Sequence, residues 1–454
     1  MPHRTAIINL VALTHDQLGD MPRLSALLSG GSTAKLQPHF PAVTCTSQTT
    51  MLTGEPPAVH GIVGNGWHDR KTGKTRFWQQ SDGLVESERI WNQLRRLDPS
   101  ITTANCFWWY AMYAGADVSI TPRPMYPADG RKIPDIWTAP ESLRDAVQAE
   151  LGPFPLFRFW GPAADIASSK WIADAARFVN STIDPTVLLA YLPHLDYGLQ
   201  KFGPGSTAMR QERSALDTVA ADLIEELMTG GRRILLVNEY GISPVSDAIA
   251  PNRLLRSHGL LAIRRELGRE LLDAPASKAF AVTDHQVAHV YVSEQDRIGE
   301  VATLLEALDG VDAVLQGDSI AAAGLDHARS GDIVCIAAAE RWFCHDWWNT
   351  PAEAPDYQRT VDIHRKPGYD PRELFIDPAI RFPRLAIAAR LARKRLGFRG
   401  LMDIIPLDTA LVRGSHGRCD PHLDPLLWCS ESIELPERLP MAEVPDLIQR
   451  IVLG

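Results

Sequence analysis

Thr44 has the sequence surroundings expected of a nucleophile. It follows a strand-like run from Gln37 to Val43 and precedes a helical stretch from Thr46 to Leu52. A hydroxyl at a helix N-terminus faces unpaired backbone N–H groups and the positive end of the helix dipole, which favour a developing alkoxide. Thr44 could therefore attack phosphorus if a metal ion or a base lowers the pKa of its hydroxyl. The alternative is that Thr44 or Thr46 only caps the helix.

Two further polar residues stand where α/β folds place site residues. Glu239 follows a buried strand, Arg233 to Val237, and precedes a glycine. His416 lies in a tight Gly-Ser-His-Gly loop that would aim its imidazole. Glu239 could equally be a solvated residue at a strand end, so the sequence leaves both interpretations open.

The segment from Phe40 to Asn65, FPAVTCTSQTTMLTGEPPAVHGIVGN, carries a family resemblance. It resembles the nucleophile segment of the type I phosphodiesterase/nucleotide pyrophosphatase family, a branch of the alkaline phosphatase superfamily. The matching residues are Phe40-Pro41, Thr44, Thr53-Gly54, Pro57, His60-Gly61-Ile62 and Asn65. The resemblance implies that Thr44 forms a covalent phosphothreonine and that Asn65 donates a hydrogen bond to a phosphate oxygen. Asn65 as a simple turn residue is the alternative.

Three later segments resemble the metal-binding segments of the same family. The segment YLPHLDYGLQKFGP places Asp196 at a ligand aspartate and Gln200 where the family has histidine. In LLVNEYGI, Glu239 and Tyr240 replace an Asp-His pair, and RGSHGR supplies His416. The resemblance therefore implies that Asp196, Glu239 and His416 hold a divalent metal ion, with zinc expected.

The first acidic ligand of the family is missing. Its position is taken by Val11, which cannot bind a metal, and Gln200 and Tyr240 are poorer zinc ligands than histidine. His194 could compensate for Gln200. The pattern predicts at most one ion bound in the usual way, and an absent ion is the other possibility. The alternative function is a non-catalytic or metal-free member of the fold that binds a phosphorylated ligand or uses altered acid/base chemistry.

Buried runs alternate with helical periods and predict the architecture. The expected strands are Ala6 to Leu13, Ile101 to Phe107, Thr186 to Leu192 and Arg233 to Val237, and the long helices include Ser169 to Asn180 and Ser206 to Thr229. This pattern predicts an α/β fold whose mostly parallel central sheet is sandwiched by helices, similar to alkaline phosphatase. Residues 1–285 and 331–454 are expected to form this core, and residues 286–330 a small α+β cap insert. Asp332 to Ala338 is expected to return to the main sheet.

Composition limits the partners. The net charge of −9 argues against a nucleic-acid surface but not against a basic pocket for a small phosphorylated substrate. No run approaches about 20 apolar residues, so no membrane is expected, and six scattered cysteines with no CxxC pair favour the cytoplasm. Oligomeric state stays open.

Further segments of the later half complete the pattern. Asp284-His285 and His289 are polar residues that could fill in the site. DIHRKPGYD, from Asp362 to Asp370, could hold a phosphate or be a solvated turn. The aromatic residues of CHDWW, Cys344 to Trp348, could line a pocket or pack the cap. Phe382 to Phe398 is basic and helical.

Overall fold

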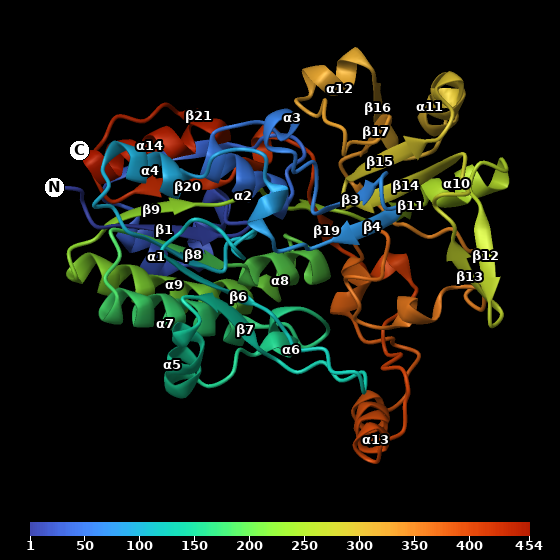
Figure 1. Ribbon diagram of the computed structural model, residues 1–454, viewed down its shortest axis with the longest axis horizontal. Coiled ribbons are helices and arrows are strands. Elements are labelled where there is room, and N and C mark those ends of the chain that lie inside the picture. Colours follow the sequence, from blue (N-terminus) through green and yellow to red (C-terminus); the bar gives the residue numbers. More distant parts are fainter.

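The computed structural model describes all residues from Met1 to Gly454. Its centre is a nine-stranded sheet with the order β21-β2-β20-β9-β1-β8-β5-β6-β7 (Figure 1). The strands are β1 (Thr5–Leu10), β2 (Ser32–Gln37), β5 (Thr103–Cys106), β6 (Val118–Pro122), β7 (Ile136–Ala139), β8 (Val187–Leu192), β9 (Arg233–Val237), β20 (Leu426–Cys429) and β21 (Arg438–Pro440). The pairs β9-β1, β1-β8, β8-β5 and β5-β6 are parallel, which confirms the predicted α/β class.

Helices cover both faces of this sheet (Figure 1). One layer contains α1 (Pro22–Leu27), α5 (Ser142–Leu151), α6 (Leu156–Phe159), α7 (Ile166–Thr182), α8 (His194–Phe202) and α9 (Met209–Thr229). The other contains α2 (Thr44–Thr53), α3 (Pro57–His60), α4 (Ile90–Leu97) and α14 (Val444–Leu453). Every residue of β1 and β8 is buried, as expected of strands covered from both sides.

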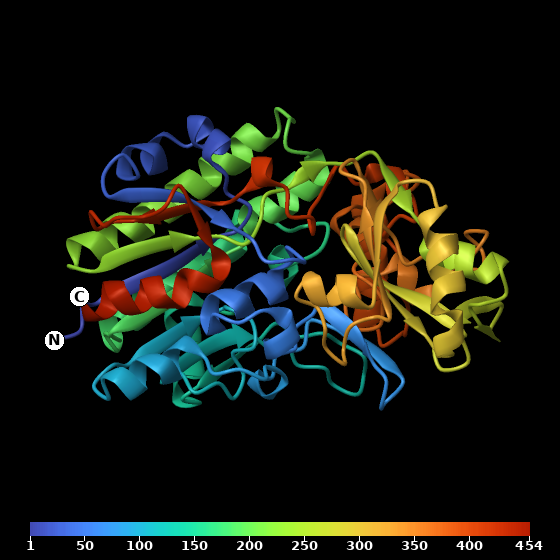
Figure 2. The same cartoon turned by 90° about the horizontal axis from the view of Figure 1, so that it is seen from above.

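A second lobe is built on a four-stranded antiparallel sheet in the order β14-β15-β17-β16 (Figure 2). Its elements are β14 (Ala279–Asp284), β15 (Val287–Val292), β16 (Val311–Gln316), β17 (Ile333–Ala337), α10 (Pro251–Ser257), α11 (Ile298–Glu306) and α12 (Asp318–Ala322). The predicted domain boundaries at 286 and 330 both fall inside the span of this sheet. The division of the chain at these residues stays a prediction. Strand β17 corrects the expectation that Asp332 to Ala338 rejoins the main sheet. A short run of apolar residues predicts a strand, but it does not predict which sheet the strand joins.

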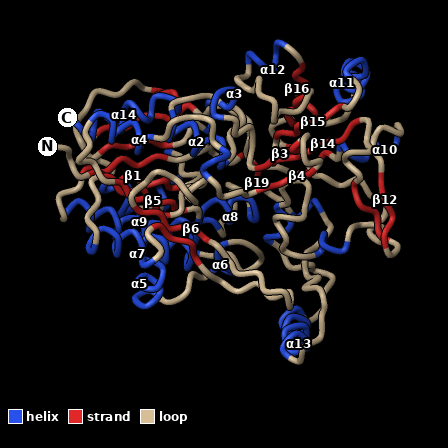
Figure 3. The backbone as a smooth tube through the Cα atoms, in the orientation of Figure 1, coloured by secondary structure: helices blue, strands red, loops and turns tan.

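Short two-stranded pairs complete the fold. They are β3 (Gly66–Asp69) with β4 (Lys74–Phe77), β10 (Ser243–Pro244) with β19 (Gly414–Ser415), β11 (Asp247–Ile249) with β18 (Arg341–Phe343), and β12 (Ile263–Glu266) with β13 (Arg269–Leu272). Helix α13 (Pro383–Arg395) projects away from both sheets (Figures 1 and 3). None of the helices combines the length and the apolar character needed to cross a bilayer.

Candidate active site

Thr44 is the first residue of α2, a helix whose ten residues are all buried. Val43 precedes it in extended backbone, and Gly54 ends the helix with a positive φ of 81°. The strand expected from Gln37 to Val43 is wrong in its extent, because β2 ends at Gln37. Pro38 and Pro41 follow, and proline cannot donate to a sheet ladder. The predicted position of Thr44 at the helix start is confirmed.

Thr44 belongs to a buried hydrogen-bond chain that also contains Tyr240 and Asp196. The Thr44 Oγ1 atom lies 2.9 Å from the Tyr240 hydroxyl oxygen. The Tyr240 hydroxyl donates to Asp196 Oδ1 over 3.2 Å. Because a phenol has one proton, its donation to Asp196 requires Thr44 to donate to Tyr240. The chain therefore runs from the hydroxyl of Thr44 to the carboxyl group of Asp196.

Asp196 occupies the first turn of α8, directly after β8, where it is buried. Burial raises the pKa of its carboxyl group to about 7, although hydrogen bonds from Tyr240 and Gln200 oppose the rise. The Gln200 amide donates to Asp196 Oδ2 over 2.8 Å and accepts from the Tyr369 hydroxyl at 2.8 Å. Asp196 is thus poised to exchange a proton near neutral pH.

Glu239 lies at the loop after β9 and has no exposed surface. Its Oε1 atom accepts from Gln48 at 2.6 Å and from Asn9 at 2.8 Å. Its Oε2 atom is buried without a hydrogen-bond partner. Burial raises the pKa of Glu239 to about 8, because these amides are neutral and no cation offsets the loss of water. Glu239 therefore holds a proton at pH 7, and the alternative of a solvated residue is excluded.

His416 completes the polar cluster from the loop after β19. Its Nδ1 atom lies 2.8 Å from the carbonyl oxygen of Ala42, and its ring stacks on Tyr240 with a centroid separation of 3.6 Å. Because a carbonyl only accepts, Nδ1 carries the proton and Nε2 keeps its lone pair. Nε2 has no hydrogen-bond partner and lies 3.8 Å from Asp196 Oδ1. Burial lowers the pKa of His416 well below its usual value, so the ring is neutral.

Asn65 is close to Thr44 but is held by other groups. Its Oδ1 atom accepts from the Cys45 backbone N–H over 2.9 Å, and its Nδ2 atom donates to Asp284 Oδ1 over 3.0 Å. The Asn65 backbone N–H also donates to Asp284 Oδ2 over 2.7 Å. These bonds join the nucleophile segment to the second lobe. One amide N–H of Asn65 stays available, so its role toward a substrate remains a prediction.

Comparison with known proteins decides the family. The profile of the family described as type I phosphodiesterase/nucleotide pyrophosphatase matches residues 5–370.

The chain belongs to the type I phosphodiesterase/nucleotide pyrophosphatase family.

Two curated relatives are similar over about half of this chain. An uncharacterised pyrophosphatase/phosphodiesterase from Schizosaccharomyces pombe is 27% identical over 227 residues, which cover 48% of this chain and 39% of that protein. Ectonucleotide pyrophosphatase/phosphodiesterase 1 from Saccharomyces cerevisiae is 25% identical over 254 residues, or 51% of this chain and 31% of that protein. The matches thus span less than half the length of either relative.

Solved structures show the same fold over almost the whole chain. Phosphonoacetate hydrolase from Sinorhizobium meliloti 1021 superposes with a TM-score of 0.63 at 16% identity, covering 99% of this chain and 96% of that one. Murine ectonucleotide pyrophosphatase/phosphodiesterase 5 gives a TM-score of 0.57 at 13% identity, with 99% and 94% covered. The predicted alkaline-phosphatase-like architecture is confirmed.

Members of the type I phosphodiesterase/nucleotide pyrophosphatase family are generally dependent on divalent metal ions. In this chain, no three His, Cys, Asp or Glu side chains are arranged to hold an ion. Asp196 and His416 lie together, but Gln200 turns its nitrogen to Asp196, and the Tyr240 hydroxyl occupies the space between Thr44 and Asp196. Val11 is fully buried and has no donor atom. The residues present therefore do not fit a two-ion centre.

The structure brings further residues to the cluster that local patterns did not assign. Asp284 ends β14, and His285 follows it in a tight turn with a positive φ of 59°. The His285 Nδ1 atom lies 2.8 Å from Asp284 Oδ1, and its ring lies 3.7 Å from those of both His416 and Tyr369. The sequence alone offered Asn9 as an amide inside an otherwise apolar strand, and Asp284-His285 as polar residues that could fill in the site without an assigned role. The other residues reach the site only through the packing of the second lobe.

Several candidates lie outside the cluster. His194 Nε2 approaches Glu212 at 2.9 Å and does not compensate for Gln200. Lys366 is buried between Asp370 and Glu373, at 3.0 and 2.8 Å, so its amine is not free to bind phosphate, whereas His364 and Arg365 of the same loop are exposed. Trp347 and Trp348 pack in the hydrophobic core of the second lobe. The packing interpretation of CHDWW is thus the one that holds.

An aromatic cluster lies next to the polar cluster through Tyr369. Trp78 contacts the rings of Trp109 and Tyr369, at centroid separations of 5.0 and 6.0 Å. Trp160 contacts Tyr369 and Tyr197 at 5.7 and 5.8 Å. Trp78 and Trp160 are only half-buried, so part of this cluster faces solvent.

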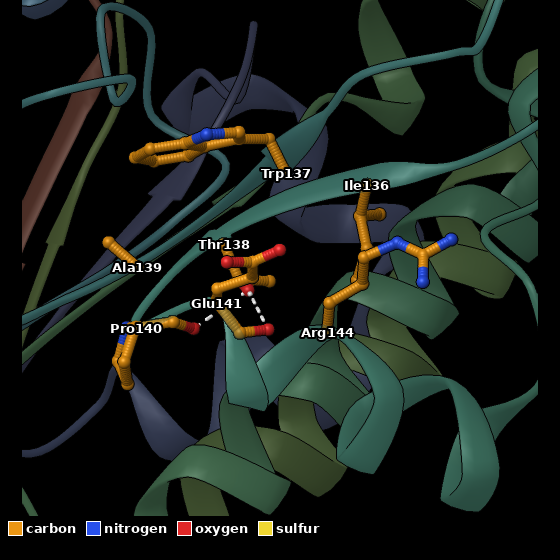
Figure 4. A pocket seen from close by; sticks show the side chains of 7 residues that line it. All are labelled: Ile136, Trp137, Thr138, Ala139, Pro140, Glu141 and Arg144. Carbon is orange, nitrogen blue, oxygen red and sulfur yellow. Dashed lines mark hydrogen bonds between the residues drawn. The ribbon is translucent and has the colours of Figure 1, made fainter.

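A separate pocket opens beside β7 and the start of α5 (Figure 4). It is lined by Ile136, Trp137, Thr138, Ala139, Pro140, Glu141 and Arg144. The Thr138 hydroxyl is already bonded to the carbonyl oxygens of Pro140 and Glu141. None of the residues around Thr44 lines this pocket, so it is not the candidate active site.

Proposed function

We propose that this chain hydrolyses a phosphate ester, either a phosphodiester or a nucleotide-type pyrophosphate bond, with Thr44 as the nucleophile. The observation that carries the proposal is the hydrogen-bond chain from Thr44 through Tyr240 to Asp196, located at the N-terminus of α2. A nucleophilic hydroxyl needs a group that accepts its proton, and a carboxylate with a pKa near neutrality suits that task. The helix N-terminus supplies N–H groups and a dipole that favour the phosphate.

In the first step, Thr44 Oγ1 attacks phosphorus and forms a covalent phosphothreonine. The Thr44 proton passes to the Tyr240 oxygen while the Tyr240 proton passes to Asp196. A concerted transfer avoids a tyrosinate, because burial raises the pKa of Tyr240 well above its usual value. The bond from phosphorus to the leaving oxygen breaks, and that oxygen keeps the electron pair.

Glu239 is the proposed acid of this step. At pH 7 it is neutral, and its unpartnered Oε2 atom is the free end of the carboxyl group. It gives its proton to the leaving oxygen and regains one from solvent. In the second step, water attacks the phosphothreonine and releases its proton to solvent. Thr44 departs with the electron pair and recovers its proton from Asp196 through Tyr240. Two carboxyl groups with separate pKa values can thus serve as base and acid.

Substrate contacts follow from the same region. Asn65 is proposed to donate its remaining amide N–H to a non-bridging phosphate oxygen, as a neutral donor suited to a charged transition state. The half-buried rings of Trp78 and Trp160 offer faces for stacking, which supports a substrate with a planar aromatic group.

Metal dependence is a separate question. That Asp196, Glu239 and His416 hold one ion, with zinc expected, stays a prediction, which elemental analysis of the purified protein tests. The reaction above relies on side chains of this chain alone. The second candidate function is binding of a phosphorylated ligand without turnover. It is supported by Val11, which is buried and has no side-chain atom that can bind a metal ion. A cytoplasmic location, supported by six free cysteines, belongs to the same proposal.

Hydrolysis of bis(p-nitrophenyl) phosphate by the wild type, Thr44→Ala and Thr44→Ser tests the nucleophile. We expect activity in the wild type, its loss in Thr44→Ala, and a partial return in Thr44→Ser, because serine restores a hydroxyl. Intact-mass spectrometry after rapid acid quench should detect a phosphorylated wild type and no phosphorylated Thr44→Ala. Equal activity of Thr44→Ala and the wild type would refute the proposal. Nucleotide binding without any turnover would favour the second candidate function.

A further inference from the structure

Helix α13 (Pro383–Arg395) is the most isolated helix of the molecule. It projects from the side of the second lobe and is joined by long loops at both ends (Figures 1 and 3). None of its residues is buried, and its least exposed large side chains are those of Ile387 and Arg390. Lys394 Nζ donates to the Gly130 carbonyl over 3.3 Å and ties the helix to the loop between β6 and β7.

The outward side of α13 is apolar. Leu385, Ala388, Ala389, Ala392 and Leu396 follow the spacing i, i+3, i+4, i+7 and i+11, which places them on one stripe of a helix. Leu385 is 69% exposed and Leu396 is 76% exposed. Phe382 and Phe398, at the two ends, are each 60% exposed. A helix normally buries such a stripe against the protein, so its outward orientation indicates a contact that the chain alone does not make.

The charges of this segment are all of one sign. Residues 381–399 contain seven Arg and Lys residues and no Asp or Glu: Arg381, Arg384, Arg390, Arg393, Lys394, Arg395 and Arg399. The whole chain has a net charge of −9, so all residues outside this segment together have a net charge of −16. Arg390 is paired with Asp403 over 2.7 Å, and the other six basic side chains give the acidic molecule one basic projection.

We propose that α13 binds the surface of an anionic lipid bilayer, with its axis in the plane of the interface. An apolar stripe flanked by basic side chains fits the boundary between acyl chains and negatively charged headgroups. A nucleic acid would complement the charges but would leave the leucine stripe exposed to water. Thirteen helical residues extend about 20 Å, which suits a helix lying in the interface rather than one crossing it.

The loop between β6 and β7 extends this surface. Met125 and Tyr126 are 44% and 57% exposed, and the loop is bonded to α13 through Gly130. Tyrosine is favoured at the headgroup level, where its ring is buried and its hydroxyl stays hydrated. The acidic remainder of the chain would be repelled by the same surface, so α13 and this loop would form the contact. This proposal departs from the expectation that no membrane is involved, and it does not depend on the proposed catalytic activity.

Sedimentation with vesicles tests the proposal. Full-length protein would be mixed with vesicles of phosphatidylcholine alone, or of phosphatidylcholine with about 30% phosphatidylglycerol. The variants are Leu385→Glu/Leu396→Glu on the stripe and Arg393→Gln/Arg395→Gln on its flank. The matched control is Leu267→Glu, at a fully exposed position in the turn between β12 and β13. Thermal unfolding would check that each variant is folded.

We expect the wild type to sediment with the anionic vesicles and not with the neutral ones. The stripe variant should bind at least about tenfold more weakly, the charge variant several-fold more weakly, and Leu267→Glu within about twofold of the wild type. Absence of wild-type binding to anionic vesicles would overturn the proposal. Equal binding by the stripe variant and the wild type would also overturn it, because the helix would then not insert.

The same protein samples test two other possible binding partners of α13. If the stripe packs against a second copy of this chain, light scattering would give a dimer mass for the wild type and a monomer mass for Leu385→Glu/Leu396→Glu. If a nucleic acid is the partner, a 20-nucleotide RNA would bind the wild type and compete with vesicles, and the stripe variant would still bind the RNA. Either result without vesicle binding would overturn the bilayer proposal.

Discussion

Glu239→Gln is expected to stabilise the protein at alkaline pH and to leave its stability nearly unchanged at acidic pH. The carboxyl group is fully buried, and both of its hydrogen-bond donors, Asn9 and Gln48, are neutral amides. A glutamine can keep both contacts through its own carbonyl oxygen. Its NH2 group would replace Oε2, which has no partner to lose. The substitution therefore removes a charge while preserving the local hydrogen bonds.

The magnitude follows from the raised pKa. Burial moves the pKa of Glu239 from 4.5 to about 8, and each unit corresponds to about 1.4 kcal/mol. Between these two values the folded state binds more protons than the unfolded state, so the free energy of unfolding falls as pH rises. This loss of stability is absent below about pH 4 and complete above about pH 8. Glutamine does not titrate, so the variant should gain roughly 3–5 kcal/mol over the wild type at pH 9.

Urea unfolding at pH 5, 7 and 9 would measure this difference, with Glu306→Gln on the surface of α11 as the control. The difference between Glu239→Gln and the wild type should grow steadily from pH 5 to pH 9, whereas Glu306→Gln should follow the wild type throughout. A Glu239→Gln variant that is no more stable than the wild type at pH 9 would refute the reasoning. That result would mean that a cation or a bound ion neutralises Glu239 in the folded protein.

Three further expectations concern the same network and its surroundings. Tyr240→Phe should lower kcat/KM for bis(p-nitrophenyl) phosphate by roughly 100-fold to 10,000-fold, because it interrupts proton transfer, whereas Tyr291→Phe in β15 should not; retained activity in Tyr240→Phe would contradict the relay. The pH profile of kcat/KM should be bell-shaped with its maximum between about pH 7 and 8, since Asp196 must be ionised and Glu239 protonated; an alkaline limb that persists unchanged in Glu239→Gln would assign it to another group. Lys366→Met should lower the free energy of unfolding, measured with urea, by roughly 3–5 kcal/mol, because Asp370 and Glu373 lose a buried partner. A decrease as small as that of a surface substitution would show that the ion pairs are dispensable.

The elements around the nucleophile were predictable because their signals are local. The helical period from Ser206 to Thr229 gives α9, and the apolar run from Arg233 to Val237 coincides with β9. The helix predicted from Thr46 to Leu52 corresponds to α2, which starts two residues earlier, at Thr44. Alternating strands and helices then fix a parallel sheet, because such units pack in few other ways.

The second lobe was less predictable because its contacts are distant in sequence. Strand β17 pairs with β15 and β16, and nothing in its short apolar run distinguishes this sheet from the main one. The same reason hides the roles of Asp284 and His285, which reach Asn65 and His416 only after the lobes pack together. The spacing of residues along the chain does not reveal such contacts between distant segments.

Tyr240 shows why a family pattern does not by itself specify the chemistry of a site. Tyrosine is a poor replacement for histidine as a metal ligand, and the sequence therefore indicates that metal binding is lost at this position. In the folded chain its hydroxyl lies between Thr44 and Asp196 and connects them. Phenol and carboxylate can move a proton, which is the part of nucleophile activation that a metal ion otherwise supplies by lowering the hydroxyl pKa.

The two buried carboxyl groups give this arrangement a directional consequence. A phosphate ester is anionic, so its approach would further raise the pKa of both Asp196 and Glu239 by like-charge repulsion. Glu239, with the higher pKa, would be held more firmly in its protonated form, whereas Asp196 would become a stronger base. Substrate binding would therefore move the working pH range upward, because Asp196 ionises only at higher pH and Glu239 keeps its proton to higher pH. The pH maximum of kcat should then lie above that of kcat/KM, and a maximum at lower pH would contradict this coupling.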